Sequence, residues 1–90
     1  MSSQAVLCNA INSHQLVRFW YEDSTPGFRI VEPHKVAHNE LNHLVLTAWF
    51  LAGESASQRG EAEGWREYLL DDISSLTVLE AQFQPSRLGL

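Results

Sequence analysis

Residues 29–50, RIVEPHKVAHNELNHLVLTAWF, decide the fold, because they hold two apolar stretches separated by a polar reversal. The first stretch belongs to a strand expected from Phe28 to about His38. Pro33 interrupts that strand, since proline cannot donate a hydrogen bond to a neighbouring strand. The second stretch, residues 43–52, is apolar on both faces, which predicts a central strand. The segment therefore predicts a hairpin whose first strand bends at its proline, as a small barrel requires.

Upstream of this hairpin, the sequence predicts one helix and one strand. Ser2 offers an N-cap oxygen, and the apolar residues after it recur with helical spacing, which predicts a helix over about residues 3–13. Residues 16–22, LVRFWYE, alternate with the period-two pattern of a strand and place Trp20 on the face opposite the apolar residues. The segment DSTPG, residues 23–27, has the composition of a turn between this strand and the hairpin.

Downstream of the hairpin, the sequence predicts a loop, two strands and a tail. Residues 53–64 are small or charged, which predicts a mobile loop. Residues 65–70 and 75–80 have the character of strands, and residues 71–74 leave room for one tight 3₁₀-like turn between them. The last residues, from position 81, are expected to be irregular.

One helix followed by five strands, with a tight turn before the last, is the order of an Sm-like, SH3-type barrel. We therefore predict a mainly β (α+β) fold: a five-stranded small barrel preceded by an N-terminal helix. An open five-stranded sheet with the helix on one face fits the same pattern. The domain is expected to span residues 1–83, with an irregular tail at 84–90. The residues predicted to be buried are Leu7, Ile11, Val17, Phe19, Leu46, Ile73 and Val78.

The composition limits the classes of protein. Ninety residues, 44% of them hydrophobic, form one domain with a small core. The net charge of −5 argues against a broad basic field that coats nucleic acid, although a small basic pocket remains compatible with it. The single cysteine, Cys8, allows no internal disulfide, and no apolar run approaches the ~18 residues of a membrane span. We expect a cytoplasmic, bacterial protein.

The sequence pattern gives little support to catalysis. Ser13 and His14 are neighbours, but their side chains diverge at a helix end, and no acid is placed to orient the histidine. Asp71 and Asp72 are adjacent in the chain instead of facing each other across a cleft. We therefore predict that the chain is not an enzyme.

Metal binding is also weakly supported. A hairpin could bring His38 and His43 together, and His34 lies on the same strand as His38. Zinc needs three or four converging ligands, and nothing in the spacing places Cys8 near the histidines. We therefore predict neither a metal nor a cofactor.

Three strings of the chain, in this order, form a recognisable pattern: AINSHQLVRFWYEDSTPGFRIVEPHKV, then LTAWF, then REYLLDDISSLTVLEAQF. Together they resemble the WYL domain, a bacterial module found mostly behind helix-turn-helix domains of transcription regulators. The most specific parts are AI before a VRFxY strand, RxVEPH in the second strand and RxYxLDxI before the last. The resemblance covers about residues 5–83.

The resemblance implies an Sm-like barrel and a role in sensing. A WYL domain is expected to bind a ligand, such as a nucleotide or a nucleic-acid fragment, and to change the activity of an attached or associated regulator. This chain carries no DNA-reading helix pair. The resemblance therefore implies a stand-alone, divergent member that modulates a transcriptional or nucleic-acid-processing partner, or that acts as an oligomer.

The resemblance also implies a ligand-binding site made of Arg29, His34 and Arg66. Both arginines match motif arginines of the family, and a guanidinium group suits bidentate capture of a phosphate or carboxylate. The histidine matches the position after the Glu-Pro pair, where it could stack on a base or donate a hydrogen bond to a phosphate. In the alternative interpretation, all three are ordinary surface groups.

Two departures from the family pattern weaken the implied site. Asn42, His43 and Leu44 occupy the positions of the Trp-Tyr-Leu triplet that gives the family its name. Residues 68–73 read YLLDDI where the family typically has Phe-Arg-Leu-Asp-Arg-Ile, so two arginines are replaced by a leucine and an aspartate. The resemblance therefore implies weak, salt-sensitive binding.

The tryptophans suggest an alternative function. Trp20, Trp49 and Trp65 could form a stacking platform for bases, or they could complete the core. Trp20 shares its strand face with charged residues, and exposed tryptophans are enriched at protein interfaces, so it is a candidate partner-facing anchor. The chain would then be a non-ligand-binding Sm-like oligomerisation or protein-interaction subunit. In either case we expect a homo-oligomer, because the core is small and an imperfectly closed barrel has unpaired edges.

Overall fold

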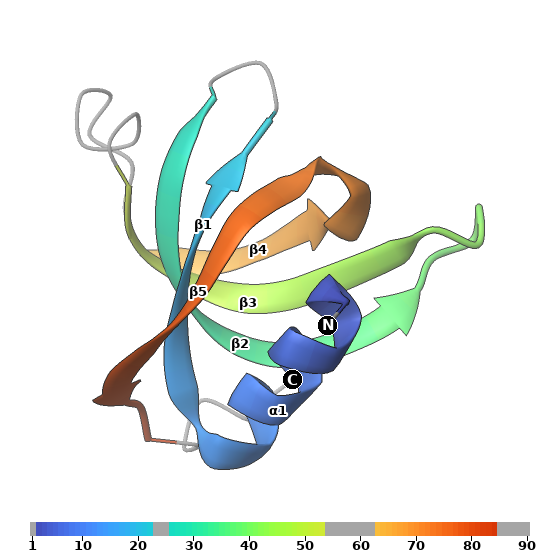
Figure 1. Ribbon diagram of the computed structural model, residues 1–90. Coiled ribbons are helices and arrows are strands. Elements are labelled where there is room, and N and C mark those ends of the chain that lie inside the picture. The colour runs from blue at the N-terminus through green and yellow to red at the C-terminus, as the bar shows by residue number, and fades with distance from the viewer. Residues whose placement is uncertain (1, 23–25, 54–62, 85–90) are drawn as a thin grey trace.

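A computed structural model describes residues 2–22, 26–53 and 63–84 of the chain. Figure 1 shows one helix followed by five strands, the order predicted from the sequence. The elements are α1 (Ser3–Ser13), β1 (Gln15–Tyr21), β2 (Gly27–His38), β3 (Leu44–Gly53), β4 (Gly64–Leu69), the 3₁₀ turn η1 (Leu70–Asp72) and β5 (Ile73–Gln82). The loop expected at 53–64, the turn at 23–27 and the tail at 84–90 lie largely outside the described residues.

The five strands form one antiparallel sheet in the order β4-β3-β2-β1-β5. Figure 1 shows the sheet strongly curled around the core. β4 and β5 are consecutive in the chain but form the two edges of the sheet, so within the described residues the barrel is not closed. The mainly β prediction is confirmed, and the open-sheet alternative describes the edges correctly. β3 is paired on both sides, as its apolar composition predicted, although β2 is the middle strand.

β2 bends at the proline, as the sequence predicted. The register between β2 and β3 shifts between Pro33 and Lys35, which makes His34 the extra residue of a bulge. Because proline has no backbone N–H, the hydrogen bonds between β2 and β3 are already interrupted at Pro33. A bulge next to it therefore removes few further hydrogen bonds. The bulge gives the long strand its change of direction and re-aims the side chain of His34.

Helix α1 is capped at both of its ends. The side chain of Ser2 accepts a hydrogen bond from the amide of Ala5 at 3.2 Å, the N-cap that the sequence predicted. At the other end His14 adopts the left-handed conformation, with φ of 55°, and its amide donates to the carbonyl of Ile11. Leu7 and Ala10 are buried where α1 packs against β1, β2 and β5. No helix in the described part of the chain has the length and apolar character to cross a membrane.

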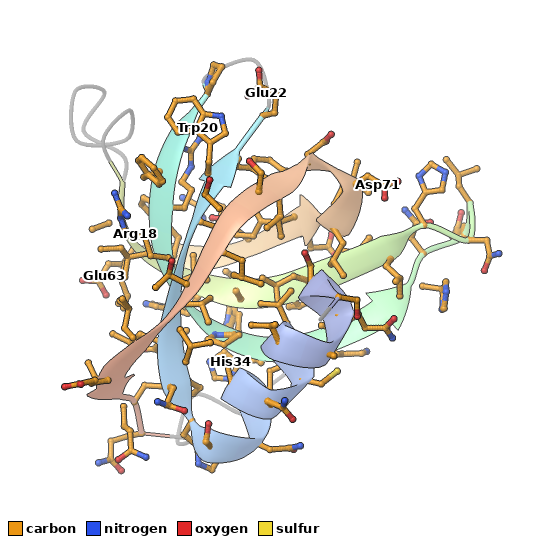
Figure 2. All side chains as sticks on the ribbon, viewed as in Figure 1. Arg18, Trp20, Glu22, His34, Glu63 and Asp71 are labelled. Carbon is orange, nitrogen blue, oxygen red and sulfur yellow. The ribbon has the colours of Figure 1, made fainter. Side chains whose placement is uncertain are left out.

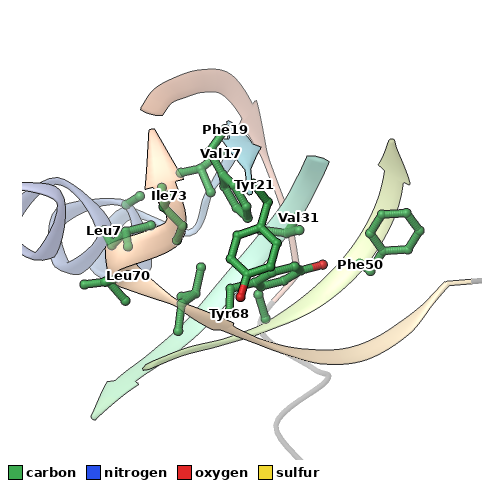
Figure 3. Close-up of a cluster of buried hydrophobic side chains, with 12 residues drawn as sticks. Leu7, Val17, Phe19, Tyr21, Val31, Phe50, Tyr68, Leu70 and Ile73 are labelled. Atoms are coloured by element: carbon green, nitrogen blue, oxygen red, sulfur yellow. The ribbon is translucent and has the colours of Figure 1, made fainter. Parts of the chain in front are cut away.

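The core lies between α1 and the concave face of the sheet. Figure 3 shows its aromatic centre, where Tyr68 makes edge-to-face contacts with Phe19 at 5.1 Å and with Tyr21 at 4.9 Å between ring centroids. The Tyr21 hydroxyl accepts a hydrogen bond from the amide of Leu69 on the edge strand β4. The buried hydrophobic residues are Leu7, Ala10, Val17, Phe19, Tyr21, Val31, Leu46, Ala48, Phe50, Tyr68, Leu70 and Ile73.

Two of the seven residues predicted to be buried are not. Ile11 is only half-buried, because the helix turns its apolar stripe toward the sheet at Leu7 and Ala10. Val78 is 37% exposed. It lies opposite Val17 in register, but β5 is an edge strand, so one side of Val78 has no neighbouring strand to cover it.

Candidate ligand-binding site

Arg29 extends from β2 toward the aromatic ring of Phe50 on β3. The residue is 5% exposed and lies in register with Phe19 of β1 and Gly53 of β3. A Cβ atom added to Gly53 would lie 3.1 Å from Arg29 Cδ and 3.3 Å from Phe50 Cε1, so both side chains occupy the space above this glycine. The same Cβ would meet the carbonyl oxygen of Phe28 at 2.6 Å, so only glycine fits here without a backbone shift.

Arg66 approaches Phe50 from the other neighbour of β3, the edge strand β4. Its guanidinium carbon lies 5.7 Å from the centroid of the Phe50 ring, within the range of a cation–π interaction. Its Nη1 donates a 2.9 Å hydrogen bond to the carbonyl oxygen of Trp65, which fixes the direction of the side chain. Arg29 and Arg66, far apart in the sequence, therefore lie on the two strands that pair with β3, Arg66 over the Phe50 ring and the Arg29 side chain beside Gly53.

The structure places His34 in a different environment. Its side chain is only 2% exposed, and its Nε2 lies 3.5 Å from Oε1 of the buried Glu32. The imidazole ring contacts Trp65 at 4.8 Å and Phe83 at 5.0 Å between centroids. The alternative of a surface histidine is therefore wrong. His34 belongs to a small polar-aromatic cluster with Glu32, Trp65 and Phe83.

Trp65 connects this cluster to an open pocket between β3 and β4. The pocket has a volume of about 440 Å³ and is lined by Thr47, Trp65, Arg66 and Glu67. Thr47 lies directly opposite Glu67 in the register of the two strands. Sequence reasoning missed both of these residues, because a threonine and an exposed glutamate carry no signal until the strand register places them together.

A second tryptophan supports Trp65 from the neighbouring strand. Trp49 lies opposite Trp65 in register, and their rings meet edge to face at 5.3 Å with an interplanar angle of 89°. The indole N–H of Trp49 donates a 3.2 Å hydrogen bond to Glu63. Both tryptophans are half-buried, so neither belongs to the fully buried core, and a stacking role for them stays a prediction.

Trp20 lies on the side of β1 that faces away from the core, as the alternation predicted. Figure 2 shows it near Arg18 and Glu22. Its indole N–H donates a 2.6 Å hydrogen bond to Glu22, and its ring packs edge to face on Phe28 at 5.1 Å. The guanidinium carbon of Arg18 lies 3.7 Å from the centroid of the Phe28 ring. Arg18, Trp20 and Phe28, hereafter the outer patch, form a half-buried cation–aromatic surface.

The side chain of Asn39 holds the β2–β3 turn. The Asn39 side chain accepts hydrogen bonds from the amides of Leu41 and His43, and Asn42 takes the left-handed conformation with φ of 62°. Two positions of the family's naming triplet, Asn42 and His43, thus lie in a tight turn. Among the described residues, no three His, Cys, Asp or Glu side chains come close enough to hold a metal ion, and Cys8 is exposed on α1.

Comparisons with known proteins agree with the family resemblance seen in the sequence. No curated protein matches the sequence of this chain. Among solved structures, Proteasome accessory factor B/C (PafBC) of Arthrobacter aurescens is similar in fold, with a TM-score of 0.72 and 19% sequence identity over 97% of this chain. The chain spans only 12% of the length of PafBC. The family model of the WYL domain matches residues 4–78, and the chain therefore belongs to the WYL domain family.

Proposed function

We propose that this chain is a WYL-type regulatory module that binds an anionic ligand, a nucleotide or a nucleic-acid fragment, through Arg29 and Arg66. The observation that carries the proposal is that both arginines come from the strands that pair with β3, with the Arg66 guanidinium over the Phe50 ring and the buried Arg29 side chain beside Gly53. Two arginines on neighbouring strands next to an aromatic ring supply charge, directed donors and an apolar surface to one region of the sheet. A concave site of this kind can attract an anion even on a chain whose net charge is −5.

The three residues singled out by the sequence take different roles in this proposal. Arg66 is half-buried and beside the open pocket, so it is the guanidinium that a phosphate reaches first. Arg29 is buried and contributes positive potential from the floor of the site. His34 acts through Trp65, whose ring it contacts from within the protein, and so it is a positioning residue for the ligand-binding site.

The regulatory part of the proposal rests on the family and on PafBC, whose name describes an accessory factor. We propose that ligand binding changes how the module contacts an attached or associated regulator in the bacterial cytoplasm, and that its role is regulatory instead of catalytic. The replacement of two family arginines by Leu69 and Asp72 leaves less positive charge near the site. Binding is therefore expected to be weak and to fall steeply as the salt concentration rises.

The test is a titration of nucleoside monophosphates and a short single-stranded oligonucleotide at low salt, monitored by tryptophan fluorescence. We expect Arg66→Gln to weaken binding by about tenfold, because it removes a charge-assisted hydrogen bond. Arg18→Gln is the matched control, since it removes the same charge from the outer patch. Equal affinity of the wild type and Arg66→Gln, or equal losses in both variants, would show that these arginines do not form a site.

A second function, as an interaction subunit without a ligand, is favoured by the outer patch and by the two edge strands β4 and β5. Aromatic residues and arginine are the types enriched at protein interfaces. This function predicts a homo-oligomer with an interface of ~800 Å² per partner or more. Sedimentation velocity tests this function, since a wild type that stays monomeric would exclude it, and the nucleotide titration distinguishes it from the first, because an interaction subunit binds none of the probes.

A further inference from the structure

We infer that the pocket between β3 and β4 is a base-binding subsite with a preference for guanine. This inference rests on the proposed function, since Arg66 lines the same pocket that would hold the base. The pocket volume of about 440 Å³ lies within the range typical of small-molecule sites. Because β4 is an edge strand, residues from both of its faces line the pocket, which places Arg66 next to Trp65 and Glu67.

Trp65 provides a fixed aromatic wall. His34 contacts its ring from one strand and Trp49 contacts it from another, both close to perpendicular, with interplanar angles of 71° and 89°. A ring held by two such contacts loses little conformational freedom when a ligand binds. Aromatic side chains bind nucleobases by stacking, without regard to which base is present, so Trp65 contributes affinity and leaves the choice of base to other groups.

Glu67 determines the base specificity of this subsite. Its side chain is exposed, and within the described ranges its carboxylate makes no hydrogen bond or ion pair. An ionised carboxylate has two acceptor oxygens and no donor. Both oxygens are engaged at once by a ligand edge that presents two adjacent donors, and Thr47, directly opposite on β3, adds a hydroxyl that can donate or accept.

Among the common nucleobases, guanine alone presents two adjacent N–H donors on its Watson–Crick edge, from N1 and N2. Adenine and cytosine each place a ring-nitrogen acceptor beside their amino group, so one carboxylate oxygen would face a lone pair. Uracil and thymine flank their single N–H with two carbonyl oxygens. The carboxylate of Glu67 therefore favours guanine, while Arg66 supplies the cation for the phosphate of the same nucleotide.

The test compares GMP, IMP, AMP and inorganic phosphate by isothermal titration calorimetry at low salt. IMP keeps the N1–H of guanine but lacks the N2 amino group. We expect the wild type to bind GMP about tenfold more tightly than AMP, with IMP between them. Glu67→Gln should reduce this ratio to about one or reverse it, because a glutamine amide presents one donor and one acceptor, the pattern that adenine complements.

Glu80→Gln is the matched control, since it makes the same charge change at an exposed position of β5 that does not line the pocket. It should leave the ratio of GMP to AMP affinity unchanged. If GMP and AMP bind equally in the wild type, or if Glu67→Gln keeps the preference for GMP, the guanine subsite is overturned while anion binding by Arg66 stands. If neither the nucleotides nor phosphate bind, the proposed function itself is overturned.

Discussion

The imidazole of His34 meets the indole of Trp65 at a centroid distance of 4.8 Å, and this contact connects the bulge of β2 to the wall of the pocket. The His34 side chain is buried, and in the view of Figure 2 it lies well apart from Trp20 of the outer patch. Because Pro33 causes the bulge and the bulge aims the histidine, a backbone feature of one strand positions an aromatic ring on another. His34 thus connects β2 to β4 in the fold, and the positioning role proposed for it rests on this contact.

Substitution of His34 is expected to destabilise the fold. His34→Ala removes the ring contacts with Trp65 and Phe83 and the neighbour of the buried Glu32 carboxylate, at a cost of about 2–3 kcal/mol in the free energy of unfolding. Urea denaturation followed by tryptophan fluorescence measures this loss. His38→Ala, an exposed position on the same strand, should change the free energy by less than about 0.5 kcal/mol. Similar effects of the two substitutions would contradict the placement of His34.

A pair of leucines tests the core. Leu46 is fully buried on β3, whereas Leu41 in the β2–β3 turn is 76% exposed. Leu46→Ala is expected to lower the free energy of unfolding by about 2–4 kcal/mol, because it leaves a cavity against the aromatic centre. Leu41→Ala should have little effect, and chemical denaturation of the two variants provides the comparison. A large effect at Leu41 would mean that this side chain is covered by a partner or by another part of the chain.

A substitution of Tyr21 tests whether its hydroxyl holds the edge strand β4 in place. Tyr21→Phe keeps the ring in the core but removes the hydroxyl that accepts the hydrogen bond from the Leu69 amide. The free energy of unfolding should fall by about 1–2 kcal/mol. Hydrogen exchange at the Leu69 amide should accelerate more than exchange at the core amides of β2, since the loss is local. Uniform acceleration across the sheet would indicate that the hydroxyl has no specific role at this edge.

Trp20 tests the interaction function. If the outer patch is an interface between copies of the chain, the wild type should sediment as a dimer or larger oligomer at high micromolar concentration, and Trp20→Ala should shift it toward the monomer. Leu41→Ala, at an exposed hydrophobic position in the β2–β3 turn and outside the outer patch and the edge strands, is the control. A wild type that remains monomeric at these concentrations would exclude this function for the patch.

The order of the elements could be predicted because each left a local signal. Alternation identified β1, the proline identified the bend of β2, and Ser2 marked the start of α1. The openness of the sheet left no such signal, because it depends on how far the strands curl, which no local pattern encodes. The same limit explains Val78, whose apolar character suggested burial although its edge position prevents it.

The candidate site was predictable only in part. Motif arginines identified Arg29 and Arg66, and the strand order then shows that both lie on strands that pair with β3. The role of His34 was not predictable, because its burial depends on Phe83, which follows the last strand and contacts it through the tertiary fold. The pocket-lining pair of Thr47 and Glu67 required the register of two strands, which the sequence does not specify.

The pairing of β1 with β5 has a consequence for how the chain is made. β1 leaves the ribosome early, but the backbone hydrogen bonds on its second edge form only when β5 has been made. The residues after β5 also hold the end of α1, because the Phe83 amide donates a hydrogen bond to the carbonyl of His14. Sheet formation therefore depends on contacts between distant parts of the chain, which are slow to form. A nascent chain that stops before residue 73 would expose an unpaired, apolar β1, so synthesis is the stage at which this domain is most prone to aggregate.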